Sequence, residues 1–419
     1  YCYYEIPLYS PLVNFLLLPI LTPVFVLALT GGLVGLVFPE TASIILFPCQ
    51  WGLALYEWVC QLVEQFPFAI IITGQPTWEV IVVYYLVLIV GTLCLRKIIL
   101  VRQTQEENKT AASKAFVRKW RRKGYGTLLG LCFTCLLLII YPKPQEAEIT
   151  FLDVGQGDGI YISTGDGTNY FIDGGSVSEK NLGRYCLLPF LKSNDIAQID
   201  YWFVSHADAD HISGLLEVLE CGYSIQNLVV AEGAPKDDNL NKVLETARLA
   251  DVQVLYMEAG DSLKTKNTSL TCLYPRANEA MENPKLLEDR NEASLVLALC
   301  FADFGGIRDF RAVFSGDISS EVEKQLLEAG ILEEVWLYKA AHHGSKYSNS
   351  LETMQVLSPE VAVVSCGKKN RYGHPSLIAI QNIQAVGAEI YYTMDSGQIT
   401  IHAKEHKKGL VIKGYHLIQ

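Results

Sequence analysis

The chain has 419 residues, more than one compact domain usually holds, so its length predicts two or three structural units. Residues 1–141 carry 10 Lys and Arg against 7 Asp and Glu, a net charge of +3, and the remaining residues carry 24 against 38, a net charge of −14. The acidic balance of the second part argues against a general nucleic-acid-binding surface, because phosphate affinity depends on Lys and Arg, so a polyanionic substrate must be held there by local basic groups or metal ions.

The first predicted element is an uncharged run over residues 14–38, long enough to cross the core of a bilayer. Pro19 and Pro23 interrupt this run, which a membrane helix tolerates better than a soluble helix does. No basic n-region precedes it, so a signal peptide is not indicated. The chain starts at Tyr1, without Met and inside a hydrophobic pattern, and we therefore expect an N-terminally incomplete protein.

Residues 41–66 form a weaker apolar segment, in which Glu57 and Glu64 accompany several aromatic residues. This composition suits either an interfacial helix or a helix that faces a polar cavity, and the sequence leaves both open. Residues 80–101 form a clear span that ends among Arg96, Lys97 and Arg102. We therefore assign residues 1–101 to an all-α, polytopic membrane domain.

A polar linker covers residues 102–123 and ends in a basic cluster, and residues 124–141 form a further transmembrane helix. Short basic loops between spans stay in the cytoplasm, so everything after Tyr141 is expected to be extracytoplasmic. The basic cluster could instead bind nucleic acid, but positive-inside anchoring explains it adequately. Cys132 and Cys135 have CxxC spacing without a second pair, which indicates small helix residues rather than a zinc site.

From about residue 146 to residue 419 the sequence predicts a separate α/β domain. Short strands separated by Gly-rich turns are expected over residues 148–154, 159–164, 169–173 and 199–205. Later strands alternate with helices near residues 213–220, 238–250, 321–329 and 375–385. This order fits an αββα sandwich, in which helices flank two sheets. Five cysteines occur after residue 141, an odd number that does not indicate a disulfide framework.

The segment from His206 to His211 carries the strongest chemical signal, because two His bracket two Asp directly after an apolar strand. Four potential ligands within six residues can converge on one or two metal ions from a turn, whereas a helical register would separate them. The alternative is a solvated acidic loop, but this pattern is rare by chance. Further acidic and imidazole groups follow other predicted strands, at Asp317, at residues 342–345 and at His374, and together they favour a two-metal site.

The loop over residues 206–211 resembles the signature of the metallo-β-lactamase superfamily, whose commoner form has His at the third position. Residues 151–158 (FLDVGQGD) are similar to the opening of this domain in one branch, the DNA-internalisation competence (ComEC) family. The resemblance continues in the family's order through IDGG, NEASLV, SGD, HHGS and NRYGHP, at residues 172–175, 291–296, 315–317, 342–345 and 370–375. Residues 7–14 (PLYSPLVN) resemble, more loosely, the end of the family's membrane channel domain.

The resemblance implies two divalent metal ions, Mn²⁺ or Zn²⁺, bound by His206, Asp208, Asp210, His211, Asp317, His343 and His374. The first two ligands would bind one ion, the next two the other, and Asp317 would bridge them. The distal histidine is His374 or His343, and the sequence does not decide between them. No His occurs between His211 and His342, so the third ligand of the first site is left to His342 or to water. Asp208 in place of His makes the site harder and moves its preference from zinc alone toward manganese or magnesium.

Asp210 and His343 are the expected catalytic residues. Residues expected to support the ligands or the substrate are Asp153, Asp158, Asp173, Asn291, His342, Ser345 and Lys346. Asp153 and Asp173 would orient the loop, although a role in a turn at a strand end is an equal alternative. Lys339, Ser345, Lys346 and Arg371 lie near the motifs and could neutralise substrate phosphates; the alternative for each is an ordinary surface side chain.

These features, together with the resemblance, predict a multi-pass cell-membrane protein for DNA uptake in natural transformation. Its membrane part would belong to a channel for single-stranded DNA, and other competence proteins and membrane lipid are its expected partners. Its extracytoplasmic domain would be a metal-dependent hydrolase, a nuclease that degrades the non-transported strand. Two alternatives remain: hydrolysis of a different ester, lactam or cyclic phosphodiester, and a docking module that binds DNA without cleaving it.

Overall fold

The computed structural model describes residues 4–106, 125–127, 130, 131, 133, 134, 145–276, 289–403 and 409–415. Most of the predicted linker and most of the predicted span over residues 124–141, with Cys132 and Cys135, lie outside these residues. The chain divides into two compact units, residues 1–143 with 192–196, and residues 144–191 with 197–419.

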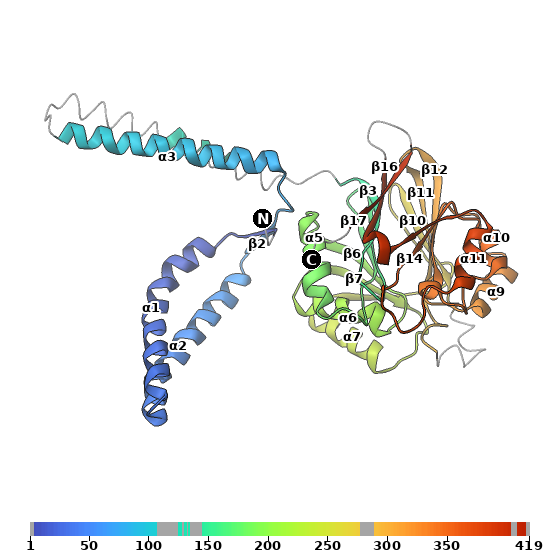
Figure 1. Ribbon diagram of the computed structural model, residues 1–419, viewed down its shortest axis with the longest axis horizontal. Coiled ribbons are helices and arrows are strands. Elements are labelled where there is room, and N and C mark those ends of the chain that lie inside the picture. Colours follow the sequence, from blue (N-terminus) through green and yellow to red (C-terminus); the bar gives the residue numbers. More distant parts are fainter. Residues whose placement is uncertain are drawn as a thin grey trace. The chain divides into compact units, whose positions relative to one another are not determined.

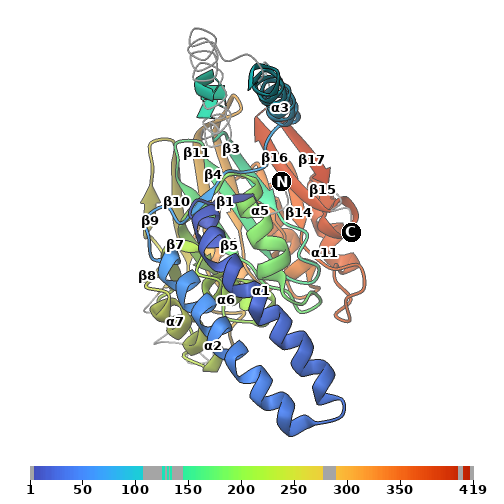
Figure 2. The ribbon, with the colours of Figure 1, turned by 90° about the vertical axis from the view of Figure 1, so that its left-hand side faces the viewer.

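The described elements of the first unit are β1 (Glu5–Pro7), α1 (Ser10–Gly35), α2 (Pro39–Glu64), β2 (Ile70–Ile72) and α3 (Trp78–Glu106). Helices α1 and α2 lie side by side in a helical hairpin (Figures 1 and 2). Gly31 of α1 and Gly52 of α2 allow this close approach: a Cβ at Gly31 would lie 2.7 Å from Leu46 Cγ, and one at Gly52 would lie 2.4 Å from Val24 Cγ2.

Within the described residues, α1 is the one helix that is long and apolar enough to cross a membrane. Pro19 and Pro23 lie inside it without ending it. Large apolar side chains along it are exposed, Phe15 by 76% and Leu29 by 57%, which is costly for a helix surrounded by water. The apolar part of α3, Trp78–Cys94, is shorter, and α2 contains three glutamates. The described part of the chain therefore contains one candidate membrane helix.

The second unit contains two sheets packed face to face (Figure 1). The first sheet has the order β17 (Leu410–Tyr415), β16 (Gln398–Ala403), β3 (Ala147–Phe151), β4 (Gly159–Thr164), β5 (Asn169–Asp173), β6 (Gln198–Val204), β7 (Ser224–Ala231) and β8 (Gln253–Met257). The second has the order β15 (Glu389–Tyr392), β14 (Val361–Val364), β13 (Leu337–Lys339), β12 (Ile307–Phe314), β11 (Val296–Phe304), β10 (Thr268–Tyr274) and β9 (Ser262–Lys264).

Alternating apolar side chains of the two sheets meet in one core, where for example the rings of Phe151 and Phe314 lie 6.3 Å apart between centroids. Outside the first sheet lie η1 (Gly183–Leu187), α5 (Leu188–Ser193), α6 (Ala209–Glu220) and α7 (Asp238–Leu249). The remaining helices are α9 (Ser320–Glu328), η3 (Ala341–Gly344), α10 (Leu351–Leu357), α11 (Leu377–Ala385) and α12 (Thr393–Ser396). Helices α9, α10 and α11 pack on the outer face of the second sheet, where Val322, Met354 and Ile383 join a second core. The predicted αββα sandwich is confirmed.

Each sheet has a parallel half, β5 to β8 in the first sheet and β12 to β15 in the second. Parallel strands end at the same edge of their sheet. The loops that follow β5, β6, β12, β13 and β14 therefore gather on one side of the sandwich. These loops contain most of the residues that the sequence analysis selected as candidate ligands.

Candidate metal centre

The loop from β6 to α6 places four candidate ligands around the start of a helix. The predicted start of the helix, at about residue 213 after a turn, was wrong: α6 begins at Ala209, with Asp208 at its N-cap position. Asp210 and His211 therefore lie in the first helical turn. The free N–H groups and positive dipole end of a helix stabilise carboxylate charge at this position.

Four buried side chains form the centre of the cluster: Asp158, His211, Asp317 and His343. One ligand atom from each lies within 4.8 Å of the corresponding atoms of the other three. His211 Nε2 is 3.4 Å and His343 Nε2 is 3.5 Å from the same oxygen, Asp317 Oδ2. Asp317 thus lies between two imidazoles that come from different sheets, the arrangement expected of a carboxylate that is shared in a metal site.

Several buried ligand atoms around this centre lack a hydrogen-bond partner among the described residues. They are Asp158 Oδ1, His206 Nε2, His211 Nε2, Asp317 Oδ1, His343 Nε2 and His374 Nδ1. A buried polar atom without a partner costs about 1–3 kcal/mol, and native structures contain few of them. Carboxylate oxygens and unpaired imidazole nitrogens gathered in one place are what a divalent cation requires, so these residues fit the metal that the fold implies.

Hydrogen bonds on the far side of each imidazole fix its orientation. His211 Nδ1 lies 2.9 Å from Asp173 Oδ2, and His343 Nδ1 lies 3.0 Å from the carbonyl oxygen of Ser365. If each Nδ1 carries the proton and donates it to these acceptors, the lone pair of Nε2 faces the centre. Asp173 also accepts hydrogen bonds from the backbone N–H and the hydroxyl of Ser205, so it joins the loop to β5.

The charges of the cluster oppose the effect of burial. Burial alone would lower the pKa of His211, but the carboxylates of Asp317 and Asp173 outweigh it and raise this pKa well above the usual value. Burial would raise the pKa of Asp317, yet His343 and His211 hold it well below its usual range. For His206, burial dominates and lowers the pKa to about 4, with a further contribution from His211. Without a metal, the centre therefore stores protons on His211 that a cation must displace.

Asp210 is a partly accessible carboxylate at the edge of the centre. Its side chain is 19% exposed, and its Oδ2 lies 3.5 Å from His343 Nε2. Burial would raise the pKa of Asp210, but the nearby imidazoles of His343 and His211 lower it. Its position and its lowered pKa keep an ionised carboxylate at the point where the site meets solvent.

Asp208 is partly engaged by an ion pair that the sequence does not predict. Its Oδ1 accepts a hydrogen bond from Arg290, which also pairs with Asp237. Its other oxygen lies 3.8 Å from His206 Nε2. The hydroxyl of Ser294 lies 3.3 Å from His206 Nδ1 and accepts from the backbone N–H of Asp317. The first of the two expected metal sites thus has fewer free donors than the second.

Asp158 has a second buried partner, Lys339, whose Nζ lies 2.9 Å from Asp158 Oδ2. Burial opposes ionisation of Asp158, but Lys339 and then His343 lower its pKa. Lys339 was one of four side chains that could neutralise substrate phosphates, but it is 1% exposed and also donates to the carbonyl oxygen of Ala340, so it is not accessible to a substrate. A fixed cation is therefore part of the centre.

A strained turn presents the two adjacent histidines. His342 and His343 have φ values of 50° and 53°, in the left-handed region that costs L-residues about 1–2 kcal/mol each. Gly344 follows with φ 79°, and a Cβ there would lie 2.7 Å from Pro375 Cβ. This turn brings His343 into the centre, whereas His342 lies at its rim with Nε2 3.7 Å from Asp317 Oδ2. Strain of this kind is found at functional sites.

His374 lies beside this turn, with its ring centroid 5.4 Å from that of His342 and 6.1 Å from that of His343. Burial, and then the charge of His343, lowers the pKa of His374 to about 4, which keeps it available as a neutral ligand. The Asn370 side chain forms two hydrogen bonds with the backbone of His374 and a third with the carbonyl oxygen of Gly367. Asn370 was part of the quoted NRYGHP motif, but nothing in the sequence assigned it this role.

The other selected residues lie outside the central cluster. Asp153 accepts from the backbone N–H of Gly155, and Asn291 bonds through its backbone to Asp289 and Ser294. Ser345 is buried and accepts from the backbone N–H of Tyr347. The Lys346 side chain is exposed, with its Nζ 4.8 Å from the centre of the Tyr347 ring. The structure therefore brings together the histidines and Asp158, Asp210 and Asp317 and leaves these four at the periphery.

Comparison with known proteins finds matches to two families. Residues 1–98 match the family model described as Competence protein, and residues 152–220 match that of the metallo-β-lactamase superfamily. ComE operon protein 3 of Bacillus subtilis is 32% identical over 290 residues, which cover 66% of this chain and 36% of that protein. Competence protein ComA of Neisseria gonorrhoeae is 25% identical over 406 residues, 95% of this chain and 48% of that protein.

Recombination protein 2 of Haemophilus influenzae is 25% identical over 286 residues, 67% of this chain and 32% of that protein. The chain thus spans a third to a half of the length of these relatives. The chain carries a Competence domain followed by a metallo-β-lactamase-superfamily domain, and the resemblance stated from the sequence motifs is confirmed.

Proposed function

Because the chain joins a Competence domain to a metallo-β-lactamase-superfamily domain, we propose that it acts in DNA uptake and that its second unit is a metal-dependent phosphodiesterase that cleaves DNA. The observation that carries this proposal is the convergence of buried, unpartnered carboxylate oxygens and imidazole nitrogens from five loops. Relatives named for competence support DNA as the substrate.

Asp158, His211, Asp317 and His343 would hold one divalent ion, and His206 and Asp208 with Asp317 would hold a second, weaker one. Manganese is favoured over zinc, because the donor set is rich in carboxylates. A divalent cation bound here would stabilise charge on the attacked phosphoryl group and lower the pKa of an attacking water.

The protein's own groups would orient the reactants. Asp210, ionised and accessible, accepts a hydrogen bond from the attacking water and holds it beside the centre. His342, exposed by 27% at the rim, would contact the bound phosphodiester. Lys339 pairs with Asp158 and would hold this carboxylate in place beside the ion. Buried surroundings strengthen each of these charges relative to water.

The first unit supplies the membrane part in this proposal. Helix α1, with its exposed apolar side chains, would cross the bilayer, and with the rest of the Competence domain it would form part of a channel for single-stranded DNA. If the basic residues before residue 124 stay in the cytoplasm, the second unit would lie outside the cytoplasmic membrane, where it would degrade the non-transported strand. Membrane lipid and other competence proteins are its expected partners.

The full chain, purified in detergent, tests the proposal. End-labelled single- and double-stranded DNA and bis(p-nitrophenyl) phosphate are incubated with Mn²⁺, with Zn²⁺ or with EDTA, and bound metal is measured by mass spectrometry. We expect cleavage with Mn²⁺ only. In Asp317→Asn the cleavage rate should fall by more than the roughly 10–100-fold that is typical when a residue supporting a metal ligand is changed. Asp309→Asn, the same change in an exposed residue of β12, is the control. If the protein hydrolyses a lactam or a cyclic dinucleotide but not DNA, then DNA is not its substrate.

One observation favours a second function, DNA docking without cleavage: Lys339 and Arg290 already neutralise two carboxylates of the centre. If these cations replace metal ions, the unit binds no Mn²⁺, and DNA uptake survives when His206 and Asp210 are both changed to Ala. Stoichiometric Mn²⁺ binding together with DNA cleavage excludes this function.

A further inference from the structure

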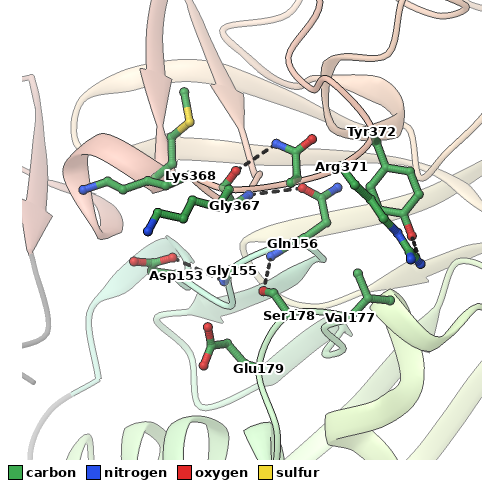
Figure 3. A pocket seen from close by; sticks show the side chains of 13 residues that line it. Asp153, Gly155, Gln156, Val177, Ser178, Glu179, Gly367, Lys368, Arg371 and Tyr372 are labelled. Atoms are coloured by element: carbon green, nitrogen blue, oxygen red, sulfur yellow. Dashed lines mark hydrogen bonds between the residues drawn. The ribbon is translucent and has the colours of Figure 1, made fainter.

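A large cavity lies next to the candidate metal centre, entirely within the second unit. Its volume is about 830 Å³, within the range of ligand-binding pockets. Met394 of α12 and three loops line it: residues 153–156 after β3, residues 177–179 after β5 and residues 367–372 after β14. Figure 3 shows Gln156 at its centre, with Lys368 and Asp153 to one side and Arg371 and Tyr372 to the other.

The loop over residues 367–372 contributes three cations to this cavity: Lys368, Lys369 and Arg371. The ion pairs found among the described residues involve none of them, and the Arg371 guanidinium lies 5.4 Å from the centre of the Tyr372 ring. The cavity also contains Asp153 and Glu179, which leaves a net positive lining in a domain whose overall charge is strongly negative. Such a local reversal of charge attracts an anionic ligand.

The same loop leads from the cavity to the metal centre. The ring of Tyr372, 48% exposed, stacks on His374 with 5.8 Å between centroids, and His374 lies against His342 and His343. A ligand that lies over Tyr372 is therefore next to the histidines of the centre.

Hydrogen bonds fix the loop in this position before any ligand binds. Asn370 donates to the carbonyl oxygens of Gly367 and His374, and the backbone N–H of Gly367 donates to Gln156 Oε1 at 3.2 Å. A Cβ at Gly367 would lie 3.0 Å from the backbone nitrogen of Gln156, so a larger residue would push the loop away. A preorganised loop loses little freedom on binding.

We propose that this cavity binds the substrate strand beside the scissile bond, with successive backbone phosphates on Lys368, Lys369 and Arg371 and a base stacked on Tyr372. The inference rests on the proposed phosphodiesterase function and specifies where its polymeric substrate lies. A groove with both cations and an exposed aromatic ring is typical of single-strand binding without sequence preference. The ligand is therefore a single nucleic-acid strand rather than a duplex or a small diester.

Binding is tested on the full chain in detergent and EDTA, so that cleavage plays no part. The probe is a fluorescein-labelled twelve-residue thymidine oligonucleotide, and its anisotropy is titrated at several salt concentrations. In Lys368→Ala/Lys369→Ala we expect the slope of log affinity against log salt to shrink by about 1.4, since each phosphate contact to a single strand contributes about 0.7. Lys242→Ala/Lys324→Ala removes the same charge from exposed positions on α7 and α9 and should leave the slope unchanged.

Tyr372→Leu should weaken binding about fivefold or more, and Tyr372→Trp should restore it, since any base can stack on an aromatic ring. Equal effects of the two lysine pairs on the salt slope, or wild-type affinity in Tyr372→Leu, would overturn the proposal. Tighter binding of duplex than of single strand would also overturn it.

A second measurement with Mn²⁺ separates this proposal from the proposed function. The ratio of kcat/KM for an oligonucleotide to kcat/KM for bis(p-nitrophenyl) phosphate should fall about tenfold in Lys368→Ala/Lys369→Ala, because only the polymer has flanking phosphates. If the wild-type protein cleaves neither substrate, the proposed function fails while the binding titration still decides the role of the cavity. If the protein cleaves both substrates and the ratio is unchanged in the variant, only the proposed role of the cavity is refuted.

Discussion

Replacing Asp173 by Asn changes the support of His211 while leaving the size of the side chain almost unchanged. The carboxylate is 2% exposed and accepts hydrogen bonds from His211 Nδ1 and from the backbone and hydroxyl of Ser205, at 2.9, 2.7 and 2.8 Å. An amide can offer only one acceptor oxygen, so its NH₂ group must face one of these donors. The proton of His211 then moves toward Nε2, the atom that faces the centre.

Two magnitudes follow for Asp173→Asn. Loss of a buried partner of a metal-bound histidine weakens metal affinity by about 10–100-fold, which is about 1.4–2.7 kcal/mol. One buried donor is left without an acceptor, so the metal-free protein should lose about 1–3 kcal/mol of stability. Both effects arise at Asp173, but only the first depends on metal.

Calorimetric titration of Mn²⁺ into the full chain measures the affinity, and thermal unfolding in EDTA measures the stability. Asp200→Asn is the matched control, since Asp200 accepts from the backbone N–H of Asn169 in the same sheet but forms no hydrogen bond or ion pair with a histidine of the described residues. Wild-type Mn²⁺ affinity in Asp173→Asn would refute the assignment of His211 as a supported ligand. An equal loss of affinity in Asp200→Asn would show that the effect is general destabilisation.

Three further changes test the charges of the centre. Lys339→Met breaks a fully buried ion pair and should destabilise the metal-free protein by about 3–5 kcal/mol, with part of the lost stability recovered in Mn²⁺. Denaturant unfolding with and without metal measures the stability, and an equal loss of stability in both conditions would contradict the prediction. Because His211 and His343 have raised pKa values, Mn²⁺ must displace their protons in order to bind. The affinity for Mn²⁺ should therefore increase from about pH 6.5 upward by up to about tenfold per pH unit for each histidine, and level off above the raised pKa values. An affinity that does not change with pH argues against both ligands. Arg290→Gln frees Asp208, and because this pair is one-third exposed the second Mn²⁺ should bind only up to about fivefold more tightly; weaker binding in the variant would mean that Arg290 supports the site instead.

The strands β4 and β5 were predicted to the residue, because Gly-rich turns bound alternating apolar residues on both sides. The start of α6 was predicted four residues too late, although the signals were present: Asp at the N-cap and Asp in the first turn are typical of a helix start. Both residues were interpreted only as ligands, so their position at the start of the helix was missed.

The histidine and aspartate motifs also predict a metal centre, and in the structure most of these residues lie close together. The sequence could not show that Asp158 belongs to the central group, since nothing distinguishes it from Asp153 five positions earlier. Asn370 and Ser294 were visible only as members of motifs, because their contacts are made with backbone and ring atoms that the fold brings near.

The sequence by itself determined the kinds of ligand, their order along the chain and the strand ends that carry them, because these depend on local hydrophobic patterns and on the chemistry of single side chains. Only the tertiary structure decided how charge is compensated: Arg290 reaches Asp208 from 82 positions away, and Lys339 meets Asp158 from the opposite sheet. Whether a carboxylate is free for a cation depends on which charges lie within a few ångströms of it, and that distance is set by the packing of the two sheets.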